Sequence, residues 1–233
     1  MSRDQRERVA ERKDFDMKTT RLLLVCAAAL APAAMAQRWE VGGGAGGGFY
    51  TSQDVSLAGS SVSAKIDSNI AGSAWLGNNS ALSKWGGQLQ FDYQLGSLAL
   101  NGDGSSASFA ARSYALHYDV LWHFRPLGSK IRPYVALGAG IKVYQGTGAQ
   151  VAYQPLQQFA LLTQAQDVTP LISGGAGVKV QIAPRVQLRF ELHDYATTFP
   201  KQVITPNTGA KVGGWLMDFV PMVGISYTSP EGR

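Results

Sequence analysis

Hydrophobic and polar residues alternate one by one over long segments of this chain, and this alternation limits the possible folds more than any other feature. In the clearest segment, Leu89, Phe91 and Tyr93 fall on one face, and Gln90 and Asp92 fall on the other. A β-strand places successive side chains on opposite faces, whereas a helix sorts residues with a period of about 3.6. The sequence therefore predicts strands with one apolar and one polar face.

The same period of two recurs along most of the chain. We predict eight strands, over residues 38–51, 69–77, 85–95, 113–124, 131–144, 172–182, 186–195 and 215–227. The connections between them alternate in length: 78–84, 125–130 and 183–185 are short, and 52–68, 96–112, 145–171 and 196–214 are long. Short turns at one end and long loops at the other are typical of an antiparallel transmembrane β-barrel with periplasmic turns and extracellular loops.

Composition excludes several other classes of protein. Charged residues make up 16% of the chain, and no apolar run after residue 36 reaches the roughly 18 residues that a membrane helix needs. The single Cys excludes a disulfide scaffold, and the 27 Gly show no triplet period of the collagen kind.

The first 36 residues are predicted to be removed before folding. A basic stretch after Met17 leads into the apolar run 22–31, and small residues up to Ala36 form a cleavage site, as in a secretory signal peptide. We expect translation to start at Met17, cleavage after Ala36, and residues 37–233 to form the barrel. The formal net charge of +5 is partly carried by this leader, so it does not indicate a nucleic-acid partner.

The two faces of the predicted strands indicate which one meets lipid. Large aromatic residues, among them Trp39, Trp122 and Trp215, lie near strand ends on the apolar face, as in the interfacial girdles of membrane barrels. The other face points into a lumen that an eight-stranded barrel leaves only wide enough for side chains. The candidate lumen network consists of Glu40, Asp92, His117, Asp119, Lys142, Lys179, Arg189, Glu191, His193 and Asp218. Because lone buried charges are costly, these groups are expected to pair and fill the lumen instead of lining an open channel.

At this point the chain resembles the OmpA/OmpX-like family of small outer-membrane β-barrels. The last strand ends in residues 223–227, Val-Gly-Ile-Ser-Tyr, which is similar to the C-terminal signal that the barrel-assembly machinery reads. The resemblance implies a bacterial outer-membrane location, with outer-membrane lipid and lipopolysaccharide as partners. Two features depart from the family pattern: residues 228–233 follow the final aromatic, and Pro221 falls inside the last strand, where we expect a bulge or a break.

No motif in the chain requires a cofactor, a metal or an enzymatic role. Residues 42–48 formally contain G-x-G-x-x-G, but a strand continues after them where a phosphate loop needs a helix. His117 with Asp119, and His193 with Glu191, have the spacing of a base and its carboxylate, yet no motif marks a nucleophilic serine. A membrane-embedded hydrolase is therefore the weakest of our hypotheses.

The connection 145–171 is the main candidate for contact with an extracellular ligand, whose identity the sequence does not indicate. Residues 150–166 are uncharged, rich in Gln and partly apolar, which is compatible with a short helix on the rim or a lid over the barrel. Phe159, Leu161 and Leu162 are the candidate contact residues, because apolar side chains exposed in a loop mark binding surfaces. We expect a non-enzymatic barrel with a structural or surface-interaction role. The alternative is a narrow porin or channel for small solutes or apolar compounds.

Overall fold

The structure is a computed structural model that describes residues 37–80, 83–102 and 104–230. The predicted signal peptide and the boundary at residue 36 lie outside these residues. Within the described part of the chain, no helix is long and apolar enough to cross a membrane.

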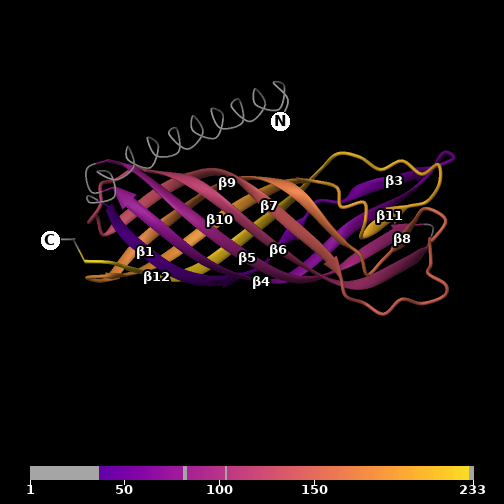
Figure 1. The fold of residues 1–233 in the computed structure, drawn as a ribbon, viewed down its shortest axis with the longest axis horizontal. Coiled ribbons are helices and arrows are strands. Elements are labelled where there is room, and N and C mark those ends of the chain that lie inside the picture. Colours follow the sequence, from indigo (N-terminus) through magenta and orange to yellow (C-terminus); the bar gives the residue numbers. More distant parts are fainter. Residues whose placement is uncertain (1–36, 81–82, 103, 231–233) are drawn as a thin grey trace, which may run out of the picture.

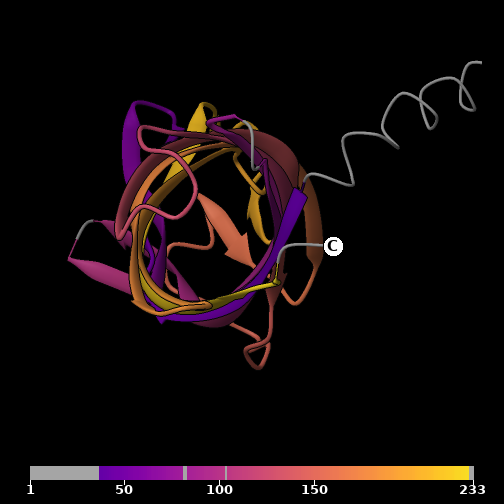
Figure 2. The same cartoon turned by 90° about the vertical axis from the view of Figure 1, so that its left-hand side faces the viewer.

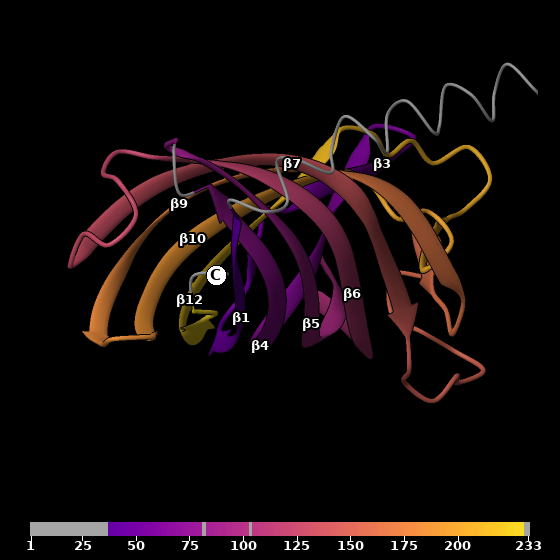
Figure 3. The same cartoon turned by 60° about the vertical axis from the view of Figure 1, so that its left-hand side comes forward.

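Eight antiparallel strands close into a barrel, as predicted. They follow the ring order β1 (Gln37–Gly46), β4 (Ser60–Ser80), β5 (Trp85–Gly102), β6 (Ser105–His123), β7 (Ile131–Gly146), β9 (Gln166–Ala183), β10 (Val186–Thr198) and β12 (Trp215–Thr228). β12 pairs with β1, and β1 pairs with β4, so the ring has no open edge over this length. Figure 1 shows the strands winding obliquely around the barrel, Figure 2 looks along its axis, and Figure 3 shows the same tilt from a third side.

The strand faces follow the predicted alternation. Outward side chains are large and apolar, and Leu137 on β7 leaves 68% of its surface exposed. The charged residues of the predicted network all face inward and are buried. A belt of exposed apolar side chains around a polar interior is the reverse of a water-soluble barrel, and it fits a wall surrounded by lipid.

Two of the three predicted short turns are present at one end of the barrel, and residues 81–82 of the third, 78–84, lie outside the described residues. Residues 124–130 connect β6 to β7, and residues 184–185 connect β9 to β10. The start of β1 and the end of β12 lie at the same end (Figure 1).

At the other end, two predictions of loops were wrong. Residues 52–68 and 96–112 are largely strand: β3 (Gln53–Leu57) pairs with the first part of β4, and β5 and β6 pair up to Gly102 and Ser105. The Ser-rich composition of these segments resembles a loop, but alternation continues through them, and Val62 and Ile66 are buried inside. A register shift between Ser68 and Ile70 adds one residue to β4 and changes which positions face inward.

Pro221 lies in an unbroken β12, contrary to our expectation. The interruption lies in the neighbouring strand instead, at residues 47–48, between β1 and the short β2 (Phe49–Tyr50). The carbonyl oxygen of Pro221 accepts a hydrogen bond from the Gly47 N–H at 3.3 Å. In an antiparallel pair both backbone groups of a residue point to the same side, so the N–H that proline lacks would also point toward this gap.

The long connections form a small sheet over the extracellular end of the barrel. β8 (Ala160–Leu162) pairs with β11 (Ile204–Pro206), and β8 crosses the ring in the axial view of Figure 2. Residues 147–159 form turns and coil, so the arrangement corresponds to the lid among our two alternatives and not to a helix on the rim.

Candidate functional site

The barrel interior holds the predicted polar residues in one continuous network. Each strand contributes side chains at alternate positions, because only every second residue of a strand faces the lumen. Three groups of contacts follow one another from the periplasmic end to the extracellular end.

Arg189 is the centre of the first group. Its Nη2 lies 2.6 Å from Oε2 of Glu191, and its Nε donates to the Tyr134 hydroxyl at 2.7 Å. Nζ of Lys179 donates to Oε2 of Glu40 at 2.5 Å, and Nη1 of Arg189 lies 3.8 Å from the other oxygen of Glu40. Two cations thus neutralise two carboxylates, and the four residues come from three strands, β1, β9 and β10. These ion pairs link the strands across the lumen.

His117 is the centre of the second group. Its Nε2 lies 3.0 Å from Oδ2 of Asp92, and its Nδ1 lies 3.1 Å from Oδ1 of Asp119. The Tyr195 hydroxyl donates to the same Asp92 oxygen at 2.8 Å. An imidazole between two carboxylates can satisfy both of them only through its two ring nitrogens, so His117 is a bridge within the network.

His193 lies beside this bridge and forms the arrangement closest to an enzyme site. Its Nδ1 lies 3.3 Å from the Ser173 hydroxyl, and its Nε2 lies 3.4 Å from Oε2 of Glu191. A serine, a histidine and a carboxylate in a row resemble the triad of many hydrolases, but the ring nitrogens are exchanged, because the triad holds its serine at Nε2 and its carboxylate at Nδ1. The sequence places Ser173 on the polar face, but no motif singles it out. Ser173 and His193 have no exposed surface and Glu191 is buried, so a substrate has no access to them in this structure.

Lys142 and Asp218 form the third group as a buried ion pair. Gln94 donates to Asp218 at 2.8 Å, and the hydroxyl of Tyr50 donates to Gln94 at 2.7 Å. Nζ of Lys142 also lies 4.7 Å from the centre of the Tyr50 ring. With this group, the structure brings together every member of the candidate network.

Several tyrosines in the network were not among the predicted site residues. Tyr134, Tyr144 and Tyr195 are fully buried and present their hydroxyls to the lumen. Their position in the strand predicts that they face the lumen, because each lies an even number of residues from the inward-facing Lys142 or His193 on the same strand. Tyrosine suits either face of a membrane barrel, so residue type alone does not place it.

Beyond the polar network the interior becomes apolar. A buried cluster joins the extracellular parts of β4, β5 and β6 to β8 and β11, and it consists largely of Val55, Val62, Ala64, Ile66, Leu98, Leu100, Phe109, Phe159, Leu162, Phe199, Val203, Ile204 and Leu216. Of the three candidate contact residues, Phe159 and Leu162 are buried in this cluster, and Leu161 is 40% exposed. A ligand arriving from outside therefore meets Leu161 but not the other two.

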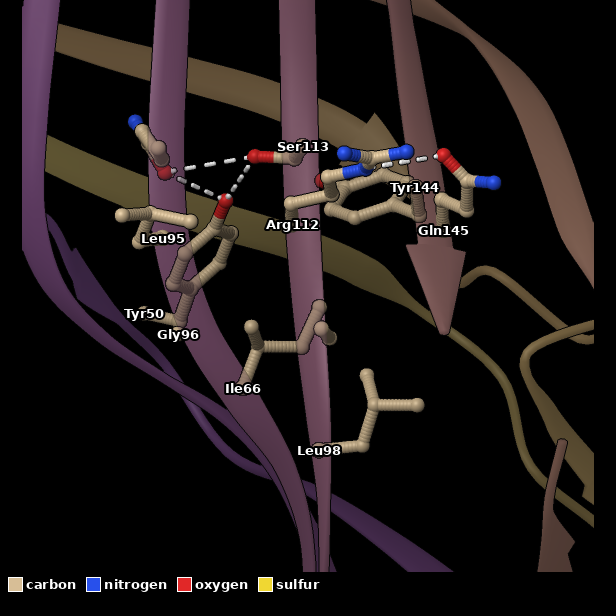
Figure 4. A pocket seen from close by; sticks show the side chains of 11 residues that line it. Tyr50, Ile66, Leu95, Gly96, Leu98, Arg112, Ser113, Tyr144 and Gln145 are labelled. Atoms are coloured by element: carbon tan, nitrogen blue, oxygen red, sulfur yellow. Dashed lines mark hydrogen bonds between the residues drawn. The ribbon is translucent and has the colours of Figure 1, made fainter. Parts of the chain in front are cut away.

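The junction of the polar and apolar layers leaves little open space. Figure 4 shows the hydroxyls of Tyr50 and Ser113 within hydrogen-bond distance of each other, with Ile66 and Leu98 on the apolar side. Both hydroxyls also donate to the side-chain oxygen of Gln94, at 2.7 Å and 3.5 Å. The cavity here has a volume of about 10 Å³, which is about one water-sized sphere. Among the described residues, no group of three or more His, Cys, Asp or Glu side chains could hold a metal ion.

These features define a class of protein: a β-barrel with an apolar belt, a polar interior and a closed extracellular end. Residues 22–215 match the family described as the outer membrane protein beta-barrel domain. The chain belongs to this family, and the protein is located in the bacterial outer membrane.

Of two similar solved outer-membrane barrels, one supports the shared fold, and the other is similar to a lower degree. The outer membrane protein OprG from Pseudomonas aeruginosa is 13% identical, with 84% of this chain and 97% of that chain covered and a TM-score of 0.53. Neisserial surface protein A is 10% identical, with 81% and 96% covered and a TM-score of 0.49. A comparison with curated proteins found no match.

Proposed function

We propose that this protein is a non-enzymatic outer-membrane barrel whose lumen does not conduct and whose extracellular extension binds a partner. The observation that carries this proposal is the filling of the interior in two layers. Paired side chains occupy the membrane-level lumen, an apolar cluster closes the extracellular end, and the junction between them holds a cavity of only about 10 Å³. The outer surface then remains as the place for function.

Single-channel conductance of the protein purified from outer membranes tests the closed lumen. The sample is first required to migrate differently on a gel before and after heating, which marks a folded barrel. We expect no discrete current steps in a planar bilayer. Reproducible steps would favour the alternative of a narrow porin and would refute the filled lumen.

The most favourable surface for a partner is the free edge of β6 in the extracellular extension. Residues 105–110 pair with β5 on one side, whereas β7 begins to pair only at Ala111. The carbonyl of Ala110 accepts hydrogen bonds from Thr147 and Gly148 on the β7 side, and backbone groups at every second residue point the same way. Ser106 and Ser108 therefore present their backbone groups at this edge, and no described strand pairs with them there.

Two further features support the binding of an extended peptide at this edge. A cleft of about 200 Å³ adjoins it, lined by residues that include Ser106, Ser108, Val151 and Pro155. The edge also carries no charge or proline, the devices by which proteins usually protect exposed edges. An added strand would gain backbone hydrogen bonds from the edge and side-chain contacts from the cleft.

Ser108→Pro and Ser108→Ala separate this role from a general surface effect. Proline removes the amide that faces the edge, whereas alanine keeps it and changes little else. The probes are fluorescent, uncharged peptides in which polar and β-branched residues alternate, and binding is measured by anisotropy. We expect binding to the wild type and to Ser108→Ala and loss of binding in Ser108→Pro. Equal binding to all three would exclude the β6 edge.

A second experiment tests whether the protein is a hydrolase, because Ser173, His193 and Glu191 lie in contact. Because all three are buried, we expect the purified protein to have no esterase or phospholipase activity on micellar substrates. Activity that disappears in Ser173→Ala, with the barrel still heat-modifiable, would overturn the non-enzymatic proposal.

The remaining proposed partners are lipopolysaccharide and the barrel-assembly machinery.

A further inference from the structure

The periplasmic end of the barrel carries exposed charge of one sign. Lys84 precedes β5, Arg125 and Lys130 lie in the turn between β6 and β7, and Arg185 lies in the turn between β9 and β10. All four side chains are exposed. We call these four residues the periplasmic rim.

No carboxylate among the described residues balances the periplasmic rim. Residues 83–84, 124–130 and 184–185 contain neither Asp nor Glu. The nearest acidic residues along the strands, Glu40 and Glu191, face the lumen and are already paired with Lys179 and Arg189. The rim is thus a net positive surface, and it extends around the barrel because its three turns lie on different strand pairs.

Aromatic side chains place the rim at the depth of lipid headgroups. Nζ of Lys84 lies 5.9 Å from the centre of the Trp122 ring, and Nη1 of Arg185 donates to the Tyr227 hydroxyl at 3.3 Å. Trp39, Trp85 and Phe124 are exposed at the same end. Aromatic rings of this kind lie at the membrane–water interface, so cations next to them lie level with phosphate groups.

Among the described residues, the extracellular end has no comparable surface that carries only positive charge. Lys65 forms an ion pair with Asp67 at 2.9 Å, and Asp54 and Asp167 lie on the same extension as the exposed Lys201 and Lys211. Charges of both signs therefore mix there. This asymmetry supplies a matched control, because Lys201 and Lys211 are cations of similar exposure at the opposite end.

We propose that the periplasmic rim binds the phosphate groups of anionic phospholipids in the periplasmic leaflet, in preference to zwitterionic phospholipids. Basic side chains next to a membrane gain roughly fivefold in affinity for anionic lipid for each Lys or Arg near the surface. Because the four cations are distributed over three turns, the site is a ring of weak contacts with several lipids and not one deep pocket.

Tryptophan quenching by brominated lipids provides a direct test. Of the five Trp residues, Trp39, Trp85 and Trp122 lie at the periplasmic end, Trp75 is buried in the lumen, and Trp215 lies toward the other end. The full protein carrying Trp215→Phe therefore reports lipid contact mainly at the rim. It is reconstituted in phosphatidylcholine vesicles with a fixed minor fraction of brominated phosphatidylglycerol or of brominated phosphatidylcholine.

We expect brominated phosphatidylglycerol to quench more strongly than brominated phosphatidylcholine. This excess should disappear in a variant combining Lys84→Gln, Arg125→Gln, Lys130→Gln and Arg185→Gln, and it should persist in Lys201→Gln with Lys211→Gln. All variants are first required to show the heat-dependent gel shift of a folded barrel. High salt should reduce the excess, because at about 1 M the screening length falls to about 3 Å.

Three results would overturn the proposal. Equal quenching by the two lipids in the starting protein would mean that the rim does not select anionic headgroups. An excess that survives in the fourfold variant would place the selectivity elsewhere. Loss of the excess on adding inorganic phosphate at constant ionic strength would assign the rim to free phosphate instead of lipid.

Discussion

Replacing Arg189 with methionine tests whether the lumen network behaves as a set of mutually dependent buried charges. In the wild type, Arg189 contacts Glu191 at 2.6 Å and Tyr134 at 2.7 Å, and it donates to Gln88 at 2.6 Å. Arg189→Met removes these contacts while roughly keeping side-chain volume. Glu191 then remains as a buried carboxylate without its principal cation, which costs about 3–5 kcal/mol in comparable buried pairs.

The combined variant Arg189→Met with Glu191→Gln separates loss of pairing from loss of packing. A neutral amide at position 191 can still accept the hydrogen bond from Tyr134, and no unpaired charge remains at that position. Because replacing a whole buried ion pair is often close to neutral, we expect the second change to restore at least half of the lost stability.

Reversible urea unfolding in lipid vesicles, followed by tryptophan fluorescence and by gel mobility, measures both variants. The coupling between the two sites is the quantity of interest, and it should exceed about 1.5 kcal/mol for a contact of this kind. If Arg189→Met alone costs less than about 1 kcal/mol, or if the double variant is no more stable than the single one, water must reach the lumen charges and the filled interior is wrong.

Two pairs of variants test the packing of the wall and of the extracellular cluster. Gly42→Ala places a Cβ 2.5 Å from the Trp75 ring and should cost about 1–3 kcal/mol in the same unfolding assay, whereas Gly72→Ala meets no atom within 4 Å and should be nearly neutral. Leu162→Ala should cost about 2–4 kcal/mol and speed proteolysis of the extension, whereas Leu161→Ala, at a 40% exposed position, should change both by little. Equal effects within either pair would contradict the packing described.

Most of the barrel could be predicted because the alternation of residues reports the two faces directly. The inward placement of His117 and Asp119 on β6 follows from their spacing alone, since β6 pairs with both neighbours without a register shift. Particular partners could not be predicted in the same way. Arg189 meets Glu191 on its own strand but Gln88 across the lumen, and the second contact depends on the stagger of strands that no local pattern encodes.

The extracellular strands were missed because both faces change character along the same strand. On β6 the inward positions are His117 and Ser113 at membrane level but Phe109 and Ala107 farther out, while the outward positions change from Leu116 to small residues. On β4 the added residue at the Ser68/Ile70 register shift moves the inward positions from even to odd numbers. The period-two pattern predicts a strand only while its apolar residues stay at either even or odd positions. It therefore ended the predicted strands at these points.

The change of character follows from what surrounds the wall. At membrane level, lipid covers the apolar belt, so the interior is free to hold polar groups that pair across the lumen. Beyond the membrane the outer surface faces water, and only the inside can bury apolar side chains. The extension therefore needs the apolar cluster and the β8–β11 cap as its own core. It follows that Leu162→Ala should loosen the extension and leave the ion pairs around Arg189 intact, because the two layers are stabilised by different surroundings.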